Sequence, residues 1–163
     1  MVVSADDVPI GGASKKNVWV NGDFHRIVRI MVEDEQGRVL IQKRLASMIL
    51  YPNCWDNSAA GHVDVGETYE TAAKRELFEE IGLDNVALEE VGYYQTHNVH
   101  QNRQLNQFVK AYKVVVKPNT DFIIQEDEVA KIEWLTVDEI KSLISNHPDE
   151  VTDGLVEVIE RFY

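Results

Sequence analysis

Three glutamates on one turn of a predicted helix are the side chains of this sequence most able to do chemistry. Glu76, Glu79 and Glu80 stand at positions i, i+3 and i+4 of residues 68–81, a segment without proline or glycine. This spacing puts three carboxylates on one face of a helix. A solvated acidic face is the plainer interpretation, because glutamate is a good helix former. The alternative is a site for Mg²⁺ or Mn²⁺, which prefer oxygen ligands and retain waters and substrate phosphate oxygens.

The balance of charges limits the partners that such a site would serve. With 28 acidic and 16 basic side chains, the formal net charge is −12, which disfavours binding to the phosphates of nucleic acid. An anionic small-molecule substrate would need a metal ion as mediator. The sequence has no long apolar run and no signal-peptide pattern, and its single cysteine, Cys54, fits a reducing compartment. We therefore expect a cytoplasmic protein with no membrane or nucleic-acid partner, and the sequence leaves a homodimer open.

Strand patterns run through most of the chain. Residues 1–26 are polar and predict a less regular lead-in with one short hairpin. A polar loop is expected at residues 97–106. The runs that predict strands cover residues 27–32, 38–43, 86–96, 107–116 and 129–135.

Helix signals lie between and after these strands. Gly82 stands where a left-handed cap would end the helix at residues 68–81. A capping pattern that starts at Thr136 and ends at Glu139 opens a second helix, and apolar residues at helical spacing predict a last one after residue 151. Because no linker or repeat is visible, we expect a single domain over residues 1–163.

The glutamates belong to a longer pattern of fixed residues. The chain fits G-x5-E-x7-R-E-U-x-E-E-x-G-U, where U is a bulky aliphatic residue, at every fixed position from Gly61 to Leu83. This pattern is the Nudix box, and the chain resembles the Nudix hydrolase superfamily. The resemblance implies an α+β fold of the α/β/α sandwich type, with a mixed β-sheet between helices and the box as a loop–helix–loop.

The resemblance also implies roles for the residues of the box. The reaction would be hydrolysis of a diphosphate bond with Mg²⁺ or Mn²⁺ as cofactor. Arg75 would orient one glutamate through a bidentate pair, and Glu67 is a weaker candidate for a contact with the substrate. The expected metal ligands are Glu76, Glu79, Glu80 and the Gly61 carbonyl.

Candidate residues outside the box complete the expected site. In resembling hydrolases an acid before the strand at 129–135 often deprotonates or positions the attacking water. We favour Glu128 over Glu126 for this role, and a solvated acidic loop remains an equal alternative. Arg44 and Lys43 are expected to contact substrate phosphates, although a basic strand end that faces solvent would look the same.

Residues 42–44 and 52–62 resemble the branch that contains isopentenyl-diphosphate isomerase and its hydrolase relatives. Ala60 stands where that isomerase has its catalytic cysteine, and Cys54, six residues earlier, reads as a small buried residue. His25 and His62 match two of the isomerase metal ligands, and His62 is also a candidate substrate contact. Residues 106–108, Asn-Gln-Phe, stand where the isomerase has acids, so its second metal site looks dismantled.

Three functions are therefore compared. The expected one is metal-dependent hydrolysis of a small nucleoside diphosphate derivative or a similar soluble diphosphate. The alternatives are isopentenyl-diphosphate isomerisation and a catalytically silent nucleotide-binding module. Loss of a metal-binding glutamate would indicate the silent module, and none is lost.

Overall fold

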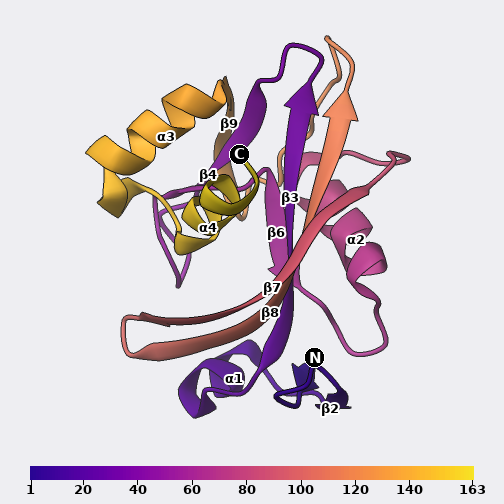
Figure 1. Cartoon of the computed structure of the whole chain (residues 1–163), viewed down its shortest axis with the longest axis vertical. Helices are drawn as coiled ribbons and strands as arrows, with labels where there is room; N and C mark the ends of the chain where they lie inside the picture. Colours follow the sequence, from indigo (N-terminus) through magenta and orange to yellow (C-terminus); the bar gives the residue numbers. More distant parts are fainter.

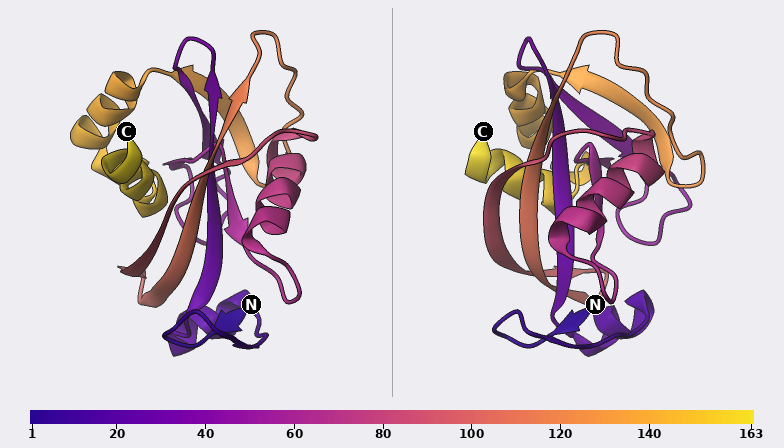
Figure 2. Two further views of the ribbon diagram at one scale, coloured as in Figure 1. Left: turned by 45° about the vertical axis from the view of Figure 1, so that its right-hand side comes forward. Right: turned by 90° about the vertical axis from the view of Figure 1, so that its right-hand side faces the viewer.

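The computed structural model describes residues 1–163, and it contains a mixed β-sheet with helices on both faces. Figure 1 shows the elements, and in the left view of Figure 2 α2 lies on one side of the sheet while α3 and α4 lie on the other. The predicted α/β/α sandwich is confirmed. The elements are β1 (Val2–Val3), β2 (Pro9–Gly11), α1 (Lys15–Asn21), β3 (His25–Asp34), β4 (Val39–Arg44), β5 (Trp55–Asp56), β6 (Ala59–His62), α2 (Tyr69–Ile81), β7 (Glu89–His100), β8 (Arg103–Val116), β9 (Val129–Leu135), α3 (Val137–Asn146), a 3₁₀ turn (Pro148–Glu150) and α4 (Asp153–Phe162).

Side-chain alternation along β3 divides the core into two layers. Val28, Ile30 and Val32 are fully buried in the layer that contains the apolar face of α2. Met31 points to the opposite layer, where it belongs to a cluster with Leu155 and other residues of α4. Both faces of β3 are therefore covered, which explains its nearly continuous apolar sequence. None of the helices is long and apolar enough to cross a membrane.

The sheet opens around β3 and β4. The two strands pair with each other only at Val32–Leu40 and Glu33–Val39. Beyond these pairs β3 continues antiparallel to β6, whereas β4 continues with β5 and β9. The other edge of β3 runs parallel to β8 from His25 to Asp34. Because β3 and β4 exchange partners, they diverge, and the residues of their diverging ends surround the site described below.

Local signals explain the box helix. The Thr68 side chain accepts a hydrogen bond from the Thr71 backbone N–H, and the Thr71 side chain accepts one from the Thr68 backbone N–H, so the first turn is capped. Gly82 ends α2 with φ of 70°, the left-handed conformation that glycine adopts without strain. The predicted helix at residues 68–81 is confirmed, as are those that begin at Thr136 and after residue 151.

One expectation about the elements was wrong, and some short elements were not predicted. The polar loop at 97–106 is mostly strand, because β7 and β8 continue to a two-residue turn at Gln101 and Asn102 and polar side chains such as His97 and Asn106 pair across the hairpin. The lead-in contains the expected hairpin, β1 with β2, and also the unexpected helix α1. The small residues of β6 carry little β-propensity, and only pairing with β3 makes them a strand.

Candidate active site

A cavity of about 640 Å³ lies between the diverging strands, within the size range of small-molecule sites. It is lined by side chains from both arms of the sheet, from α1 and α2, and from the start of α4. It brings together most of the predicted site residues, namely Arg44, Gly61, His62, Arg75, Glu76, Glu79, Glu80 and Glu128. Two predicted residues, Lys43 and Glu67, do not line it.

Glu80 is a buried carboxylate at the inner end of α2. Its Oε2 accepts hydrogen bonds from Gln42 Nε2 at 2.7 Å and from the Ala60 backbone N–H at 3.1 Å. Burial raises the pKa of Glu80 well above its ordinary value, and the nearby Glu76 charge raises it further. Two neutral donors do not offset the cost of an ionised carboxylate in this position, so a cation beside it would be favourable.

Glu76 lies against a position where only glycine fits. A Cβ atom at Gly61 would stand 1.8 Å from Glu76 Oε1, so the missing side chain makes room for the carboxylate. Burial raises the pKa of Glu76 to about 7, against the opposing effect of Arg75. Gly61 of β6 therefore leaves the space that the Glu76 carboxylate of α2 occupies.

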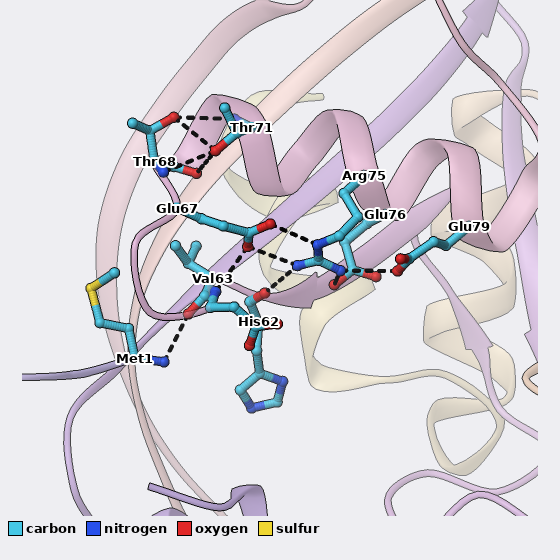
Figure 3. Close-up of polar contacts among 10 residues, drawn as sticks. Met1, His62, Val63, Glu67, Thr68, Thr71, Arg75, Glu76 and Glu79 are labelled. Atoms are coloured by element: carbon cyan, nitrogen blue, oxygen red, sulfur yellow. Dashed lines mark hydrogen bonds and ion pairs between the residues drawn. The ribbon is translucent and has the colours of Figure 1, made fainter. Parts of the chain in front are cut away.

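Arg75 connects the carboxylates of the box (Figure 3). Its Nε and Nη2 donate to the two oxygens of Glu67 at 2.8 and 2.9 Å, which is a bidentate pair. Its Nη1 donates to Glu76 Oε1 at 2.8 Å and to Glu79 Oε2 at 3.0 Å, and Nη2 also donates to the His62 carbonyl. Arg75 therefore fixes the box loop and two glutamates at once, and Glu67 acts through Arg75 rather than facing the cavity.

The donor set fits a hard divalent cation. Glu80 is buried and Glu76 is half-buried, the charge of each carboxylate disfavours that of the other, and the Gly61 backbone lies against Glu76. The side chains do not form a complete cage of three ligands. Mg²⁺ suits such a site because it commonly binds one or two carboxylates and completes its shell with waters and substrate phosphates.

The acidic segment before β9 reaches the cavity. The backbone N–H groups of Ile123 and Gln125 donate to the Ile81 and Glu80 carbonyls, which ties the segment to the end of α2. Glu128 lines the cavity, together with Asp127, and Glu126 does not. The placement agrees with the preference for Glu128, and it adds Asp127, which sequence analysis did not single out.

The two expected basic contacts lie on opposite faces of β4. Arg44 faces the cavity, where its Nη1 contacts Asp56 Oδ2 at 3.0 Å. Lys43 packs over the Trp55 ring and lies 3.7 Å from Glu150, outside the cavity. The pairing of β4 with β9 shifts register between Lys43 and Arg44, and the two side chains leave the strand on different sides. The structure therefore brings Arg44 to the cavity and not Lys43, and a contact of Lys43 with substrate phosphates stays a prediction that this position does not favour.

Lys15 of α1 and Arg29 of β3 are basic residues of the cavity that sequence analysis missed. No local pattern distinguishes them, because they reach the site through the packing of α1 and through strand register. Cys54 lies outside the cavity, where its Sγ is 3.7 Å from the Pro52 carbonyl and 3.6 Å from that of Asp149. Burial raises the pKa of this thiol, so Cys54 is a protonated structural residue.

The fold and the site together define a class of protein, an α/β/α sandwich with a carboxylate-bearing helix beside a cavity of small-molecule size. Residues 23–160 match the model of the NUDIX domain. Because the match spans most of the chain, the protein belongs to the Nudix family, and it is a hydrolase that acts on diphosphate bonds.

Individual relatives place the chain within the family. It is 34% identical to isopentenyl-diphosphate Delta-isomerase 2 of Photorhabdus laumondii over 159 residues, and this alignment covers 98% of this chain and 89% of that protein. It is 30% identical to the uncharacterized Nudix hydrolase YfcD of Escherichia coli over 141 residues, an alignment that covers 85% of this chain and 74% of that protein. The crystal structure of DR0079 from Deinococcus radiodurans has the same fold, with a TM-score of 0.83 at 24% identity over 99% of this chain and 97% of that one. The chain is a member of the isomerase-like branch, as its sequence predicted.

Proposed function

We propose that this protein is a metal-dependent hydrolase that cleaves the diphosphate bond of a small soluble molecule, such as a nucleoside diphosphate derivative. The observation that carries the proposal is the placement of Glu76 and Glu80, one half-buried and one buried carboxylate that share a cavity with Arg75. Such groups are costly without a cation or strong donors. A divalent ion would neutralise them and would let an acidic protein bind an acidic substrate.

Glu76, Glu79, Glu80 and the Gly61 carbonyl are the groups that would hold Mg²⁺ or Mn²⁺. When bound, the ion supplies charge neutralisation, polarisation of a phosphoryl oxygen and a lower pKa for water. Arg75 keeps Glu76 and Glu79 in place through its Nη1 contacts. Gln42 does the same for Glu80, because its amide donates to Oε2 and leaves Oε1 free for another partner.

The remaining residues act on the water and the substrate. A water oxygen attacks phosphorus, the bond from phosphorus to the bridging oxygen breaks, and the two phosphate-bearing products separate. Glu128 accepts the proton of the attacking water, a role that fits its position on the cavity wall beside Asp127. Arg44 and Lys15 are the cavity cations that would contact substrate phosphates.

Isomerisation of isopentenyl diphosphate is the second candidate, because it is the activity named for the relative in Photorhabdus laumondii. Two features of this chain count against it. Ala60 stands at the position that resembles the catalytic cysteine of the isomerase, and Cys54 lies outside the cavity. A silent nucleotide-binding module is disfavoured because the glutamates of the box are all present and three of them, Glu76, Glu79 and Glu80, line the cavity. The cytoplasmic location and the possibility of a homodimer stay predictions.

A turnover screen tests the proposal. Nucleoside diphosphate derivatives, other soluble diphosphates and isopentenyl diphosphate are incubated with Mg²⁺ or Mn²⁺, and release of phosphate or monophosphate is measured. We expect turnover that is lost in EDTA and falls by orders of magnitude in Glu79→Gln and Glu80→Gln. Glu70→Gln is the matched control, since Glu70 is exposed on the same helix and pairs with Lys74. Normal turnover in both site variants with Mg²⁺ present would contradict the proposal.

A further inference from the structure

Trp19 places an unused hydrogen-bond donor at the cavity. It comes from α1, packs with Val18 and Leu105, and is only 8% exposed. Trp19 lines the cavity, and its buried Nε1 has no acceptor in the protein. An indole N–H can only donate, and a buried donor without an acceptor is costly. A purely structural tryptophan would be expected to find a partner or to bury only its apolar ring.

His62 contributes a second unpartnered atom to the same wall. Its ring lies 6.1 Å from the Trp19 ring between centroids, and its buried Nε2 has no protein partner. His25 stacks on the His62 ring, with 5.2 Å between the ring centroids and an interplanar angle of 14°. His62 also lines the cavity, so the two unpartnered nitrogens share one wall.

Neighbouring hydrogen bonds fix the character of this wall. Arg29 Nη2 donates to Gln107 Oε1 at 3.1 Å, so the Gln107 amide nitrogen is turned toward His25 Nε2, 3.4 Å away. His25 Nδ1 lies 3.1 Å from the Asp23 carbonyl and donates to it. A ring that donates through Nδ1 and faces an amide donor through Nε2 is neutral.

Lys15, four residues before Trp19 on α1, is a charged side chain that also lines the cavity, and the rings themselves are held by uncharged contacts. The Arg29 guanidinium is paired with Glu157, and burial lowers the pKa of His25, in agreement with the neutral ring that its hydrogen bonds require. Ile27 and Leu105 supply apolar surface beside these polar atoms. Because two unpartnered ring nitrogens stand beside apolar surface, this wall complements a group that forms hydrogen bonds and is partly apolar. It does not complement an alkenyl group, which would leave Trp19 Nε1 and His62 Nε2 buried without partners.

We propose that Trp19 and His62 form a subsite that hydrogen-bonds a polar group of the substrate, a sugar or a nucleobase, so that the enzyme selects polar diphosphates over isoprenoid diphosphates. This inference rests on the proposed function and names the substrate class of that same cavity. Trp19 donates through Nε1 to an oxygen or ring nitrogen of this group. The carboxylates of α2 lie at the other side of Gly61 and His62, where the diphosphate would be held.

Direct binding of hydrolysis products tests the subsite without any need for turnover. Calorimetry with Mg²⁺ present compares ribose 5-phosphate, the four ribonucleoside 5′-monophosphates, isopentenyl monophosphate and methyl phosphate. The variant Trp19→Phe keeps an aromatic ring and removes the N–H. Trp134→Phe is the matched control, because Trp134 packs with Phe122 and Arg38 outside the cavity.

We expect polar monophosphates to bind more tightly than methyl phosphate and isopentenyl monophosphate. Trp19→Phe should weaken the binding of the polar monophosphates about tenfold, which is the effect of one lost hydrogen bond. Methyl phosphate binding should not change, and Trp134→Phe should match the wild type. A loss already seen with ribose 5-phosphate assigns the subsite to the sugar, whereas a loss confined to nucleotides assigns it to the base. Equal affinities for all the compounds, or wild-type binding by Trp19→Phe, would overturn the inference. Absence of turnover with intact, Trp19-dependent binding would instead refute the proposed hydrolysis alone.

Discussion

The contact between Gly61 and Glu76 gives a sharp test of the site, because one added methyl group must displace a carboxylate. In Gly61→Ala the new Cβ would start 1.8 Å from Glu76 Oε1 and 2.1 Å from its Cδ. Real Cβ atoms essentially never approach a neighbour closer than 3.0 Å, so the oxygen must retreat by about 1.2 Å, the difference between the two distances. Pairing of β6 with β3 at Gly61 and Val28 holds the backbone, so the side chain has to move.

The expected effect follows from that displacement. A shift of about 1 Å at a catalytic group can lower the rate by about 100-fold, which is about 2.7 kcal/mol on the barrier. The Glu76 contact with Arg75 Nη1, 2.8 Å in the wild type, would also be lost. The substitution keeps the Gly61 carbonyl, so any loss reports on Glu76 rather than on a missing backbone ligand.

The assay is kcat/KM for the best diphosphate of the screen, measured over a range of Mg²⁺ concentrations. Gly37→Ala is the control, because Gly37 has φ of 76° and open space around the missing Cβ. It should cost about 1 kcal/mol of stability from backbone strain and leave kcat/KM unchanged. Wild-type kcat/KM and Mg²⁺ dependence in Gly61→Ala would refute the role of this contact.

Two further predictions concern single carboxylates. In EDTA, the raised pKa of Glu76 makes the folded state bind more protons than the unfolded state between pH 4.5 and about 7, so the free energy of unfolding should fall by about 3 kcal/mol as pH rises through that window. Urea unfolding of Glu76→Gln should lack this part of the slope, and parallel curves for the two proteins would contradict the assignment. For the proton acceptor, Glu128→Gln should remove the acidic limb of the pH–rate profile while Glu126→Gln keeps it. An unchanged limb in Glu128→Gln would exclude Glu128 from that role.

The features that could be predicted from sequence are those with local causes. The box helix is specified by its cap at Thr68, its apolar face and its terminal Gly82, all within a few turns of chain. The strands of the core follow from runs of β-branched residues. Along α2, helical spacing was sufficient to bring Glu76, Glu79 and Glu80 to one cavity.

The features that were missed depend on pairing between distant segments. Adjacent residues such as Lys43 and Arg44 look equivalent in sequence, and only the register of β4 in the sheet decides which one faces the cavity. Trp19 and Arg29 reach the site because α1 packs against β8 and because β3 runs between β6 and β8. Fixed spacing along one helix is visible in a sequence, whereas the positions of separate strands are not.

Hydrolysis in H₂¹⁸O tests most directly whether water attacks phosphorus in this site. The products of the best diphosphate substrate are analysed by mass spectrometry, with isopentenyl diphosphate as a parallel substrate. We predict that cleavage by water places one ¹⁸O atom in one of the two phosphate-bearing products, that EDTA abolishes this labelling, and that isopentenyl diphosphate yields no dimethylallyl diphosphate. Conversion of isopentenyl diphosphate to its isomer at unchanged mass, with no labelled phosphate from any diphosphate, would contradict the account.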